Sequence, residues 1–270
     1  MKNMIVSDID GTIIPREVTD DVLSNYTVSV FKDAMKDNVI VLATGRIFSN
    51  AIKLINKYNI GDYLIGLNGA FVYNIKKKKY LYKNKFPKKI AKKIVDIANI
   101  KSEKLYLCTL NNWNFYTNVE EYKNSLFPEE KLLNNPYDII NKEDIYKFEI
   151  YYNTDDKVKE FLELIKYNKI NISYNIIQRL NNKGYFIEVA YKDVDKYYGV
   201  KILSKKLKIR NENIIAFGDN SNDCTMVKGV GTGIAVSNAV EEVRNAATIV
   251  IGDVYSDSVA KYIEEMNKKI

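Results

Sequence analysis

Histidine is absent from this chain of 270 residues. Its absence excludes the usual base of Ser-His-Asp sites, a phosphohistidine acceptor and the commonest ligand of transition metals. Catalysis by this chain would have to use carboxylates, lysines or hydroxyl groups. Hard oxygen donors of this kind favour Mg²⁺ over Zn²⁺.

Cysteine is nearly absent as well, since the chain has only Cys108 and Cys224. Two cysteines so far apart fit neither a zinc knuckle nor a disulfide framework, which indicates a reducing compartment. The chain also lacks a run of eighteen apolar residues, and its N-terminus has no secretory apolar stretch. We therefore expect a cytoplasmic protein with no membrane partner.

Proline is scarce, with four residues, and no proline-rich or glycine-rich linker marks a domain boundary. The composition is 46% hydrophobic and 28% charged, which is typical of a globular chain with one large domain or two modest ones. The formal charge of +7 comes from dispersed lysines. The one dense run, 76–79, lies between two β-rich stretches and predicts a solvated hairpin tip, so no nucleic-acid partner is expected.

Short apolar β-rich runs alternate with amphipathic stretches at both ends of the chain. Strands are expected at MIVS, VIVLAT and YLIGLN, with helices near 20–36 and 48–58, and the rhythm returns after about residue 193. This alternation predicts βαβ units and a parallel sheet. The stretch between reads as antiparallel strands with helices near 87–99 and 156–167. The sequence thus predicts an α/β protein with a core at 1–82 and 192–270 and an inserted α+β domain at 83–191.

The first predicted strand ends in the sequence S-D-I-D-G-T. Alternate residues of an extended segment point to one side, so Asp8 and Asp10 can face the same ligand, and Gly11 lets the chain turn away. Two adjacent carboxylates repel each other unless a cation neutralises them. The arrangement suits phosphoryl transfer, with Asp8 as the attacking group and Asp10 as acid and then base. A solvated turn with a helix cap is the alternative.

Further polar residues follow other predicted strands, at the edge where open parallel sheets bind ligands. They are Thr44 and Gly45 after VIVLA, and Asp219, Asn222 and Asp223 after IIAFG. Helix caps and turn residues are the alternative for each. A positive group for a phosphate is also needed, and Lys196 is a candidate at the start of a predicted helix. Lys192 and Lys201 compete for that role on spacing alone.

These residues together resemble the haloacid dehalogenase superfamily. The resemblance rests on D8-x-D10-G-T12, T44-G-R46, Lys196 and G-D219-x-x-N222-D223, and the N68-G-A70 and GIAVSNA stretches are similar to its Cof-type phosphatase branch. It implies a Rossmann-like parallel-sheet core with an inserted α/β cap domain that selects the substrate.

The resemblance also implies a role for each matching residue. Asp8 would be nucleophile and Mg²⁺ ligand, and Asp10 acid/base with its backbone carbonyl on the metal. Asp219 and Asp223 would complete the metal site. Phosphate or substrate would be bound by Thr12, Thr44, Gly45, Arg46, Asn68, Lys196 and Asn222. The chain departs from the family pattern at Tyr197, where glycine is usual, and at Asp257-Ser258-Val259, where Asp-Gly-Val is usual.

The resulting hypothesis is a Mg²⁺-dependent phosphatase of small phosphate monoesters, such as sugar phosphates, that works through an aspartyl phosphate on Asp8. A phosphomutase that uses the same intermediate is the alternative. A signalling receiver or binding protein without turnover is disfavoured by the D-x-D spacing and the long insertion. The glycines of G229-V-G231-T-G233 mimic a dinucleotide fingerprint but follow a helical stretch, so a turn before a strand is expected and NAD is not. Oligomeric state stays open between a monomer and a weak dimer.

Overall fold

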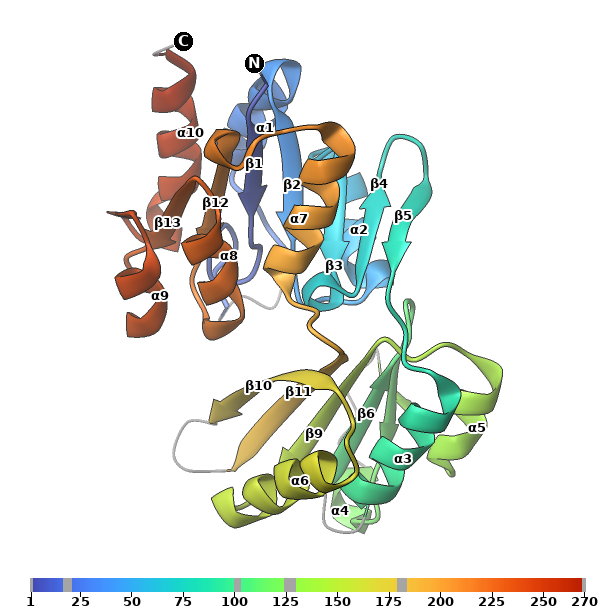
Figure 1. Cartoon of the computed structure of the whole chain (residues 1–270). Helices are drawn as coiled ribbons and strands as arrows, with labels where there is room; N and C mark the ends of the chain where they lie inside the picture. The colour runs from blue at the N-terminus through green and yellow to red at the C-terminus, as the bar shows by residue number, and fades with distance from the viewer. Residues whose placement is uncertain (1, 17–20, 100–102, 124–129, 179–183, 269–270) are drawn as a thin grey trace. The chain divides into compact units, whose positions relative to one another are not determined.

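The computed structural model describes residues 2–16, 21–99, 103–123, 130–178 and 184–268. It divides the chain into two compact units. The core unit comprises Met1–Arg46, Asn50–Lys83 and Asp195–Ile270, and the inserted unit comprises Ile47–Ser49 and Asn84–Val194. Figure 1 shows one sheet in each unit.

The core unit is built on an eight-stranded sheet with the order β14-β13-β12-β1-β2-β3-β4-β5. Its strands are β1 Met4–Ser7, β2 Val39–Ala43, β3 Tyr63–Gly66, β4 Phe71–Asn74, β5 Lys79–Lys83, β12 Ile214–Gly218, β13 Thr232–Val236 and β14 Ile249–Ile251. Neighbouring strands from β14 to β3 pair in parallel, whereas β4 and β5 form an antiparallel hairpin. Both the predicted parallel sheet and the predicted hairpin are confirmed.

Helices cover both faces of this sheet (Figure 1). They are α1 Asn25–Asp37, α2 Phe48–Tyr58, α7 Lys196–Leu207, α8 Cys224–Gly229, α9 Glu241–Ala246 and α10 Ser258–Lys268. Strand residues Met4 and Val6 pack with Val200 of α7 and Met226 of α8 on one face. The sheet is thus buried on both sides, which explains why β1 and β2 read as continuous apolar runs.

Helix α1 begins later than the expected residue 20. The side chain of Ser24 accepts a hydrogen bond from the Thr27 amide at 2.9 Å, which makes Ser24 the N-cap residue. Because the cap fixes Ser24 in an extended conformation, the helix starts at Asn25.

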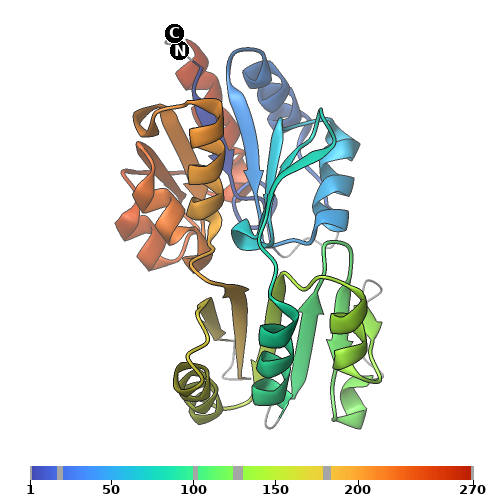
Figure 2. The same ribbon diagram turned by 45° about the vertical axis from the view of Figure 1, so that its right-hand side comes forward.

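The inserted unit contains a six-stranded sheet with the order β10-β11-β9-β6-β7-β8. Its strands are β6 Lys104–Cys108, β7 Trp113–Tyr116, β8 Glu130–Leu132, β9 Lys147–Tyr152, β10 Ile172–Gln178 and β11 Tyr185–Tyr191, and its helices are α3 Lys88–Asn99, α4 Glu120–Lys123, α5 Pro136–Lys142 and α6 Asp155–Tyr167. All pairings are antiparallel except β7 with β8. Figure 2 shows α3 and α6 on the same face of this sheet.

The two faces of the inserted sheet differ in chemistry. Phe148, Ile150 and Ile187 face the helices and form the apolar core of the unit. Lys147 and Glu149 alternate with those residues along β9 and therefore point to the opposite face, where Lys147 is only 2% exposed. This unit has the mixed α/β composition that the sequence predicts.

The register of the core sheet places three loops at one edge. Ser7 of β1 is paired with Phe217 of β12 on one side and with Leu42 of β2 on the other. Because these strands are parallel, the residues that follow them leave the sheet side by side. Asp8, Thr44 and Asp219 all belong to such loops. Among the residues that the structure describes, no helix has both the length and the apolar character to cross a bilayer.

Candidate active site

Asp8 follows the central strand β1 and is 3% exposed. Its amide donates to the carbonyl of Phe217 at 3.0 Å, so the β1–β12 ladder fixes its backbone. The chain then turns at Gly11, which has a φ of +90°. A Cβ atom at Gly11 would lie 2.2 Å from Oδ2 of Asp219, so the turn requires glycine for both conformation and space.

Lys196 is the first residue of α7 and is 1% exposed. Its Nζ lies 2.6 Å from Oδ1 of Asp8 and 2.6 Å from Oδ1 of Asp223. The N-cap of this helix is Asp195, whose carboxylate accepts a hydrogen bond from the Tyr198 amide at 2.6 Å. The cap and the helix start therefore place a buried ammonium group between two carboxylates that are 215 residues apart in sequence.

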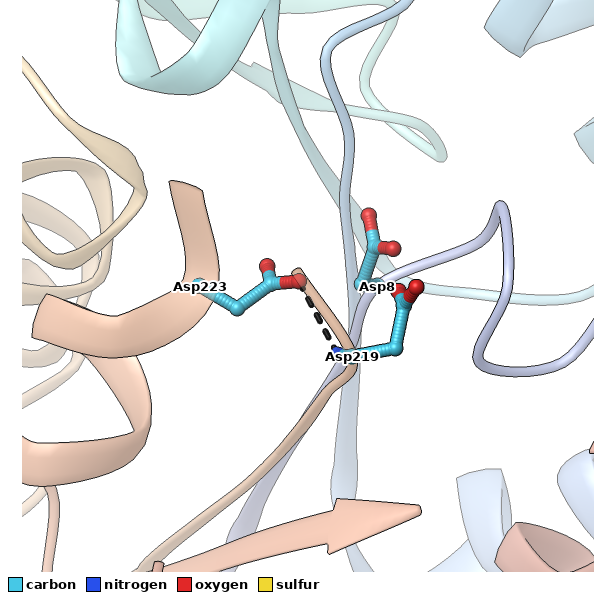
Figure 3. Close-up of side chains that lie close together, drawn as sticks. All are labelled: Asp8, Asp219 and Asp223. Carbon is cyan, nitrogen blue, oxygen red and sulfur yellow. Dashed lines mark hydrogen bonds between the residues drawn. The ribbon is translucent and has the colours of Figure 1, made fainter. Parts of the chain in front are cut away.

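Three acidic side chains from two loops lie close together (Figure 3). Asp8, Asp219 and Asp223 each offer one carboxylate oxygen, and these oxygens lie within 4.8 Å of one another. Asp223 is oriented by the backbone, because its Oδ2 accepts from the amides of Asp219 and Asn220, each at 3.1 Å. Buried carboxylate oxygens at this spacing fit a hard divalent cation such as Mg²⁺.

Two arginines bind acids of the same region. Arg16 donates through Nε and Nη2 to both carboxylate oxygens of Asp219, at distances from 2.9 to 3.1 Å. Arg46 donates through Nε to Oδ2 of Asp10 at 2.9 Å and through Nη1 to Oδ2 of Asp21 at 2.6 Å. The side chain of Asp10 is therefore engaged by Arg46, while Asp8 is engaged by Lys196.

Comparison with known proteins shows the family of this chain. The family model described as haloacid dehalogenase-like hydrolase matches residues 5–263. The chain belongs to the haloacid dehalogenase-like hydrolases. A relative named 5-amino-6-(5-phospho-D-ribitylamino)uracil phosphatase YcsE, from Bacillus subtilis, is 26% identical over 266 residues, covering 96% of this chain and 94% of the relative.

Solved structures of the same superfamily share the fold. A phosphatase from Bacteroides thetaiotaomicron, BT1666, has a TM-score of 0.83 at 20% identity and covers 99% of this chain and 96% of its own. The structure of the sugar phosphatase BT4131 has a TM-score of 0.79 at 21% identity, and the match covers 98% of this chain and 99% of the BT4131 chain. The predicted family and fold class are thus confirmed, and the protein is a haloacid dehalogenase-like hydrolase with relatives named phosphatases.

The remaining predicted residues of the hydrolase line the same edge of the sheet. Thr44 is fully buried, and its Oγ1 accepts from the Arg46 amide at 3.1 Å. The Asn68 amide donates to the Thr44 carbonyl at 3.0 Å, and Asn68 adopts a left-handed φ of 53°. Gly45 lies against this side chain, since a Cβ there would be 3.1 Å from Oδ1 of Asn68.

Asn222 contacts this group through its side-chain amide. Its Nδ2 donates to Oδ1 of Asn68 at 3.0 Å. Its Oδ1 is buried and has no hydrogen-bond partner in the described part of the chain. Thr12 donates through its hydroxyl to Oδ1 of Asp219 at 3.0 Å and thereby joins the acidic cluster. Binding of phosphate by Thr12, Gly45, Arg46 and Asn222 stays a prediction.

The electrostatics of the hydrolase site reflect an excess of acid. Burial raises the pKa of Asp8 well above its ordinary value, and the Asp223 carboxylate raises it further against the opposing effect of Lys196. Burial also raises the pKa of Asp219, although Arg16 opposes this. For Lys196, burial lowers the pKa, but the carboxylates of Asp223 and Asp8 outweigh burial and raise it overall, so the ammonium stays charged.

The departures from the family pattern have structural explanations away from the reacting groups. Tyr197 donates through its hydroxyl to the Gly229 carbonyl at 2.7 Å, and its ring fills the space that a side chain at position 229 would need. Asp257 has a φ of 52° and accepts from the hydroxyls of Ser24 and Thr27, each at 2.8 Å. It therefore ties the start of α10 to the start of α1.

Sequence reasoning did not single out Arg16 or Asp21. Arg16 contacts Asp219, which is 203 residues away, and no periodicity or motif marks that contact. The one available signal in the sequence was that Arg16 follows closely after the loop that carries Asp8 and Asp10.

Glycines 229, 231 and 233 lie between a helix and a strand, as expected, because Gly229 ends α8 and Gly233 belongs to β13.

Proposed function

We propose that this hydrolase is a Mg²⁺-dependent phosphatase that removes the phosphoryl group from small phosphate monoesters through an aspartyl phosphate on Asp8. One observation carries the proposal: a buried carboxylate, Asp8, lies at the end of the central strand, paired with Lys196 and within 4.8 Å of two further acids. A nucleophile for an anionic phosphate needs this combination of a free carboxylate and nearby positive charge.

In this proposal Asp8, Asp219 and Asp223 would hold Mg²⁺, and the family resemblance adds the backbone carbonyl of Asp10 as a further ligand. The bound ion supplies positive charge that screens the carboxylates from each other and from the phosphate. Lys196 holds Asp8 in position through the 2.6 Å contact and adds a second positive charge at the phosphoryl group. Thr44 and Asn68, which the β2 and β3 loops fix by backbone contacts, orient the phosphoryl oxygens.

The two chemical steps use Asp8 and Asp10 in turn. A carboxylate oxygen of Asp8 forms a bond to phosphorus while the ester P–O bond breaks, and Asp10 gives its proton to the leaving alkoxide. A water molecule then attacks phosphorus, Asp10 takes a proton from that water, and the bond between phosphorus and Asp8 breaks. Arg46 donates to both carboxylate oxygens of Asp10 and holds this residue in place, so one of these two contacts has to open when Asp10 carries the proton.

The substrate class follows from the relatives and from the two-unit architecture. A phosphatase relative is named for a phosphoribityl compound, and a structural neighbour is named a sugar phosphatase. We therefore propose phosphate esters of polyhydroxylated metabolites, with the inserted unit acting as a cap that selects among them. A cytoplasmic location is part of the proposal, supported by the free thiols of Cys108 and Cys224.

The test is phosphate release from an aryl phosphate and from a panel of sugar and polyol monophosphates, with purified protein and Mg²⁺. We expect Asp8→Asn to lose at least about a thousandfold in kcat, because the nucleophile is removed. Chelation of Mg²⁺ should silence the wild type, and added Mg²⁺ should restore it. Asp33→Asn, which changes an exposed acid on α1, is the charge-matched control and should keep full activity.

Two results would contradict the proposal. Undiminished phosphate release by Asp8→Asn would exclude Asp8 as nucleophile. Isomerised sugar phosphate without released phosphate would show a phosphomutase instead.

A further inference from the structure

Arg16 binds the carboxylate of Asp219, which is one of the proposed metal ligands. Oδ2 of Asp219 accepts from Nε at 3.1 Å and from Nη2 at 2.9 Å, and Oδ1 accepts from Nη2 at 3.1 Å. Oδ1 also accepts from the Thr12 hydroxyl at 3.0 Å. Three donor hydrogens make these four contacts, because one Nη2–H is shared between the two oxygens, and they use most of the accepting capacity of Asp219.

The contacts of Asp219 limit how a cation can bind to it. A divalent ion that binds Asp219 needs a lone pair of one of its oxygens. Because Thr12 and Arg16 use most of these lone pairs, an ion that binds Asp219 competes with the Arg16 fork for the same carboxylate. Repulsion between a guanidinium and a divalent ion on the same carboxylate acts in the same direction.

The charges around Asp219 also favour an exchange. With Lys196 and Arg16 in place, the three carboxylates of Asp8, Asp219 and Asp223 keep one net negative charge. Replacement of the single charge of Arg16 by a divalent ion balances the group. The buried Lys196 cannot take part in the exchange because it is 1% exposed and paired with two acids.

The exposure of Arg16 permits it to leave. Its side chain is 44% exposed, whereas that of Asp219 is 6% exposed. The guanidinium can therefore exchange its contacts with Asp219 for contacts with water, provided that the incoming cation replaces it on the buried carboxylate. The Asp219 carboxylate has no such freedom and needs a positive partner at all times.

We infer that Arg16 is an exchangeable counter-cation of the metal site: it holds Asp219 in the metal-free hydrolase, is displaced when a divalent cation binds, and thereby lowers the affinity of the site for that cation. The inference rests on the proposed metal site. It assigns to Arg16 a positioning role, since Arg16 acts on Asp219 and on no reacting atom.

The experiment measures Mg²⁺ binding to substrate-free protein by titration calorimetry. We expect Arg16→Gln to bind Mg²⁺ roughly fivefold to twentyfold more tightly than the wild type, because the competing pair is lost. The Mg²⁺ affinity of Arg16→Lys should lie between those of Arg16→Gln and the wild type, since lysine keeps the charge but loses the bidentate contact. Arg210→Gln removes the same charge from a pair that is 63% exposed on both sides and should stay within about twofold of the wild type.

Thermal unfolding gives a second readout that does not depend on turnover. Without Mg²⁺, Arg16→Gln should unfold at a lower temperature than the wild type, because Asp219 loses its partner. Saturating Mg²⁺ should raise the unfolding temperature of Arg16→Gln by more than it raises that of the wild type.

The outcomes separate this inference from the proposed function. Equal or weaker Mg²⁺ binding by Arg16→Gln, with normal binding by the wild type, would overturn the role of Arg16 alone. Failure of the wild-type protein to bind Mg²⁺ would overturn both the metal site and the role of Arg16.

Discussion

Gly69 shows how one residue affects the position of Lys196, which the proposed mechanism uses. It follows the left-handed Asn68 and has a φ of +99°. A Cβ atom there would lie 1.9 Å from the carbonyl oxygen of Asp195, the N-cap residue of α7. The absence of a side chain thus lets the loop after β3 pack against the start of the helix that carries Lys196.

Replacement of this glycine is a residue-scale test of that packing. Gly69→Ala should destabilise the protein by about 2–4 kcal/mol, because backbone strain at positive φ adds to a collision with Asp195. It should also reduce phosphatase activity, because a displacement of the Asp195 backbone would move the adjacent Lys196. Urea unfolding and aryl phosphate hydrolysis measure the two effects.

The matched control is Gly61→Ala. Gly61 has a similar φ of +86°, but its nearest contact for a Cβ atom is 3.4 Å. It should therefore show the strain without the collision, at about 1 kcal/mol, and keep activity. Equal losses in both variants would mean that contact with Asp195 contributes nothing.

At the scale of elements, β9 carries an unusual buried ion pair. The side chain of Lys147 is 2% exposed, and its Nζ contacts Glu149 on the same strand and Oε1 of Glu188 on β11 at 3.1 Å. Burial and Glu188 raise the pKa of Glu149 against the opposing effect of Lys147. Strands β9 and β11 therefore share a face on which one ammonium contacts two acids.

Removal of that ammonium should destabilise the inserted unit. Lys147→Met leaves two carboxylates buried without their cation, which costs about 3–5 kcal/mol in the free energy of unfolding at pH 7. The loss should shrink at pH 5, because burial raises the pKa of Glu149 and this acid can take up a proton as the pH falls. Urea unfolding of the wild type and of Lys147→Met at pH 7 and pH 5 measures this difference in the free energy of unfolding.

An exposed lysine provides the comparison for this prediction. Lys85→Met breaks a pair with Asp144 in which the lysine is 57% exposed, and should cost at most about 1 kcal/mol. If the Lys147 and Lys85 variants lost the same amount, the buried pair would have no special energetic role.

At the scale of the whole molecule, tyrosines whose pKa is raised in the folded protein contribute to the response to alkaline pH. Burial raises the pKa of Tyr146 from its ordinary value of 10 to about 12. A hydrogen bond to Asp96, together with burial, raises the pKa of Tyr137 to about 12 as well. Between pH 10 and 12 the unfolded chain releases these protons while the folded protein retains them, so stability falls as pH rises through this window.

Urea unfolding between pH 9 and 11.5 tests this expectation. The wild type should lose stability progressively above about pH 10. Tyr146→Phe should lose it less steeply, whereas Tyr167→Phe, which changes a tyrosine that is 84% exposed, should follow the wild type. A Tyr146→Phe curve parallel to that of the wild type would contradict the assignment.

Local sequence determined the elements of this protein and the chemical identity of its site. The apolar runs of β1, β2 and β12 are buried on both faces and read as parallel strands, and the acids and the threonine directly follow those strands. Because parallel strands end at one edge, the convergence of Asp8, Thr44 and Asp219 follows from the order of the elements.

Only the tertiary structure decided which partner each charged side chain has. The pairs Lys196 with Asp8, Arg16 with Asp219, and Arg46 with Asp10 and Asp21 join loops that are up to 203 residues apart. Lys147 likewise meets Glu188 only because β9 and β11 are neighbours. Periodicity and capping are local and report the conformation of each segment, whereas the choice of an ion-pair partner depends on distances and burial that exist only after the sheet has formed.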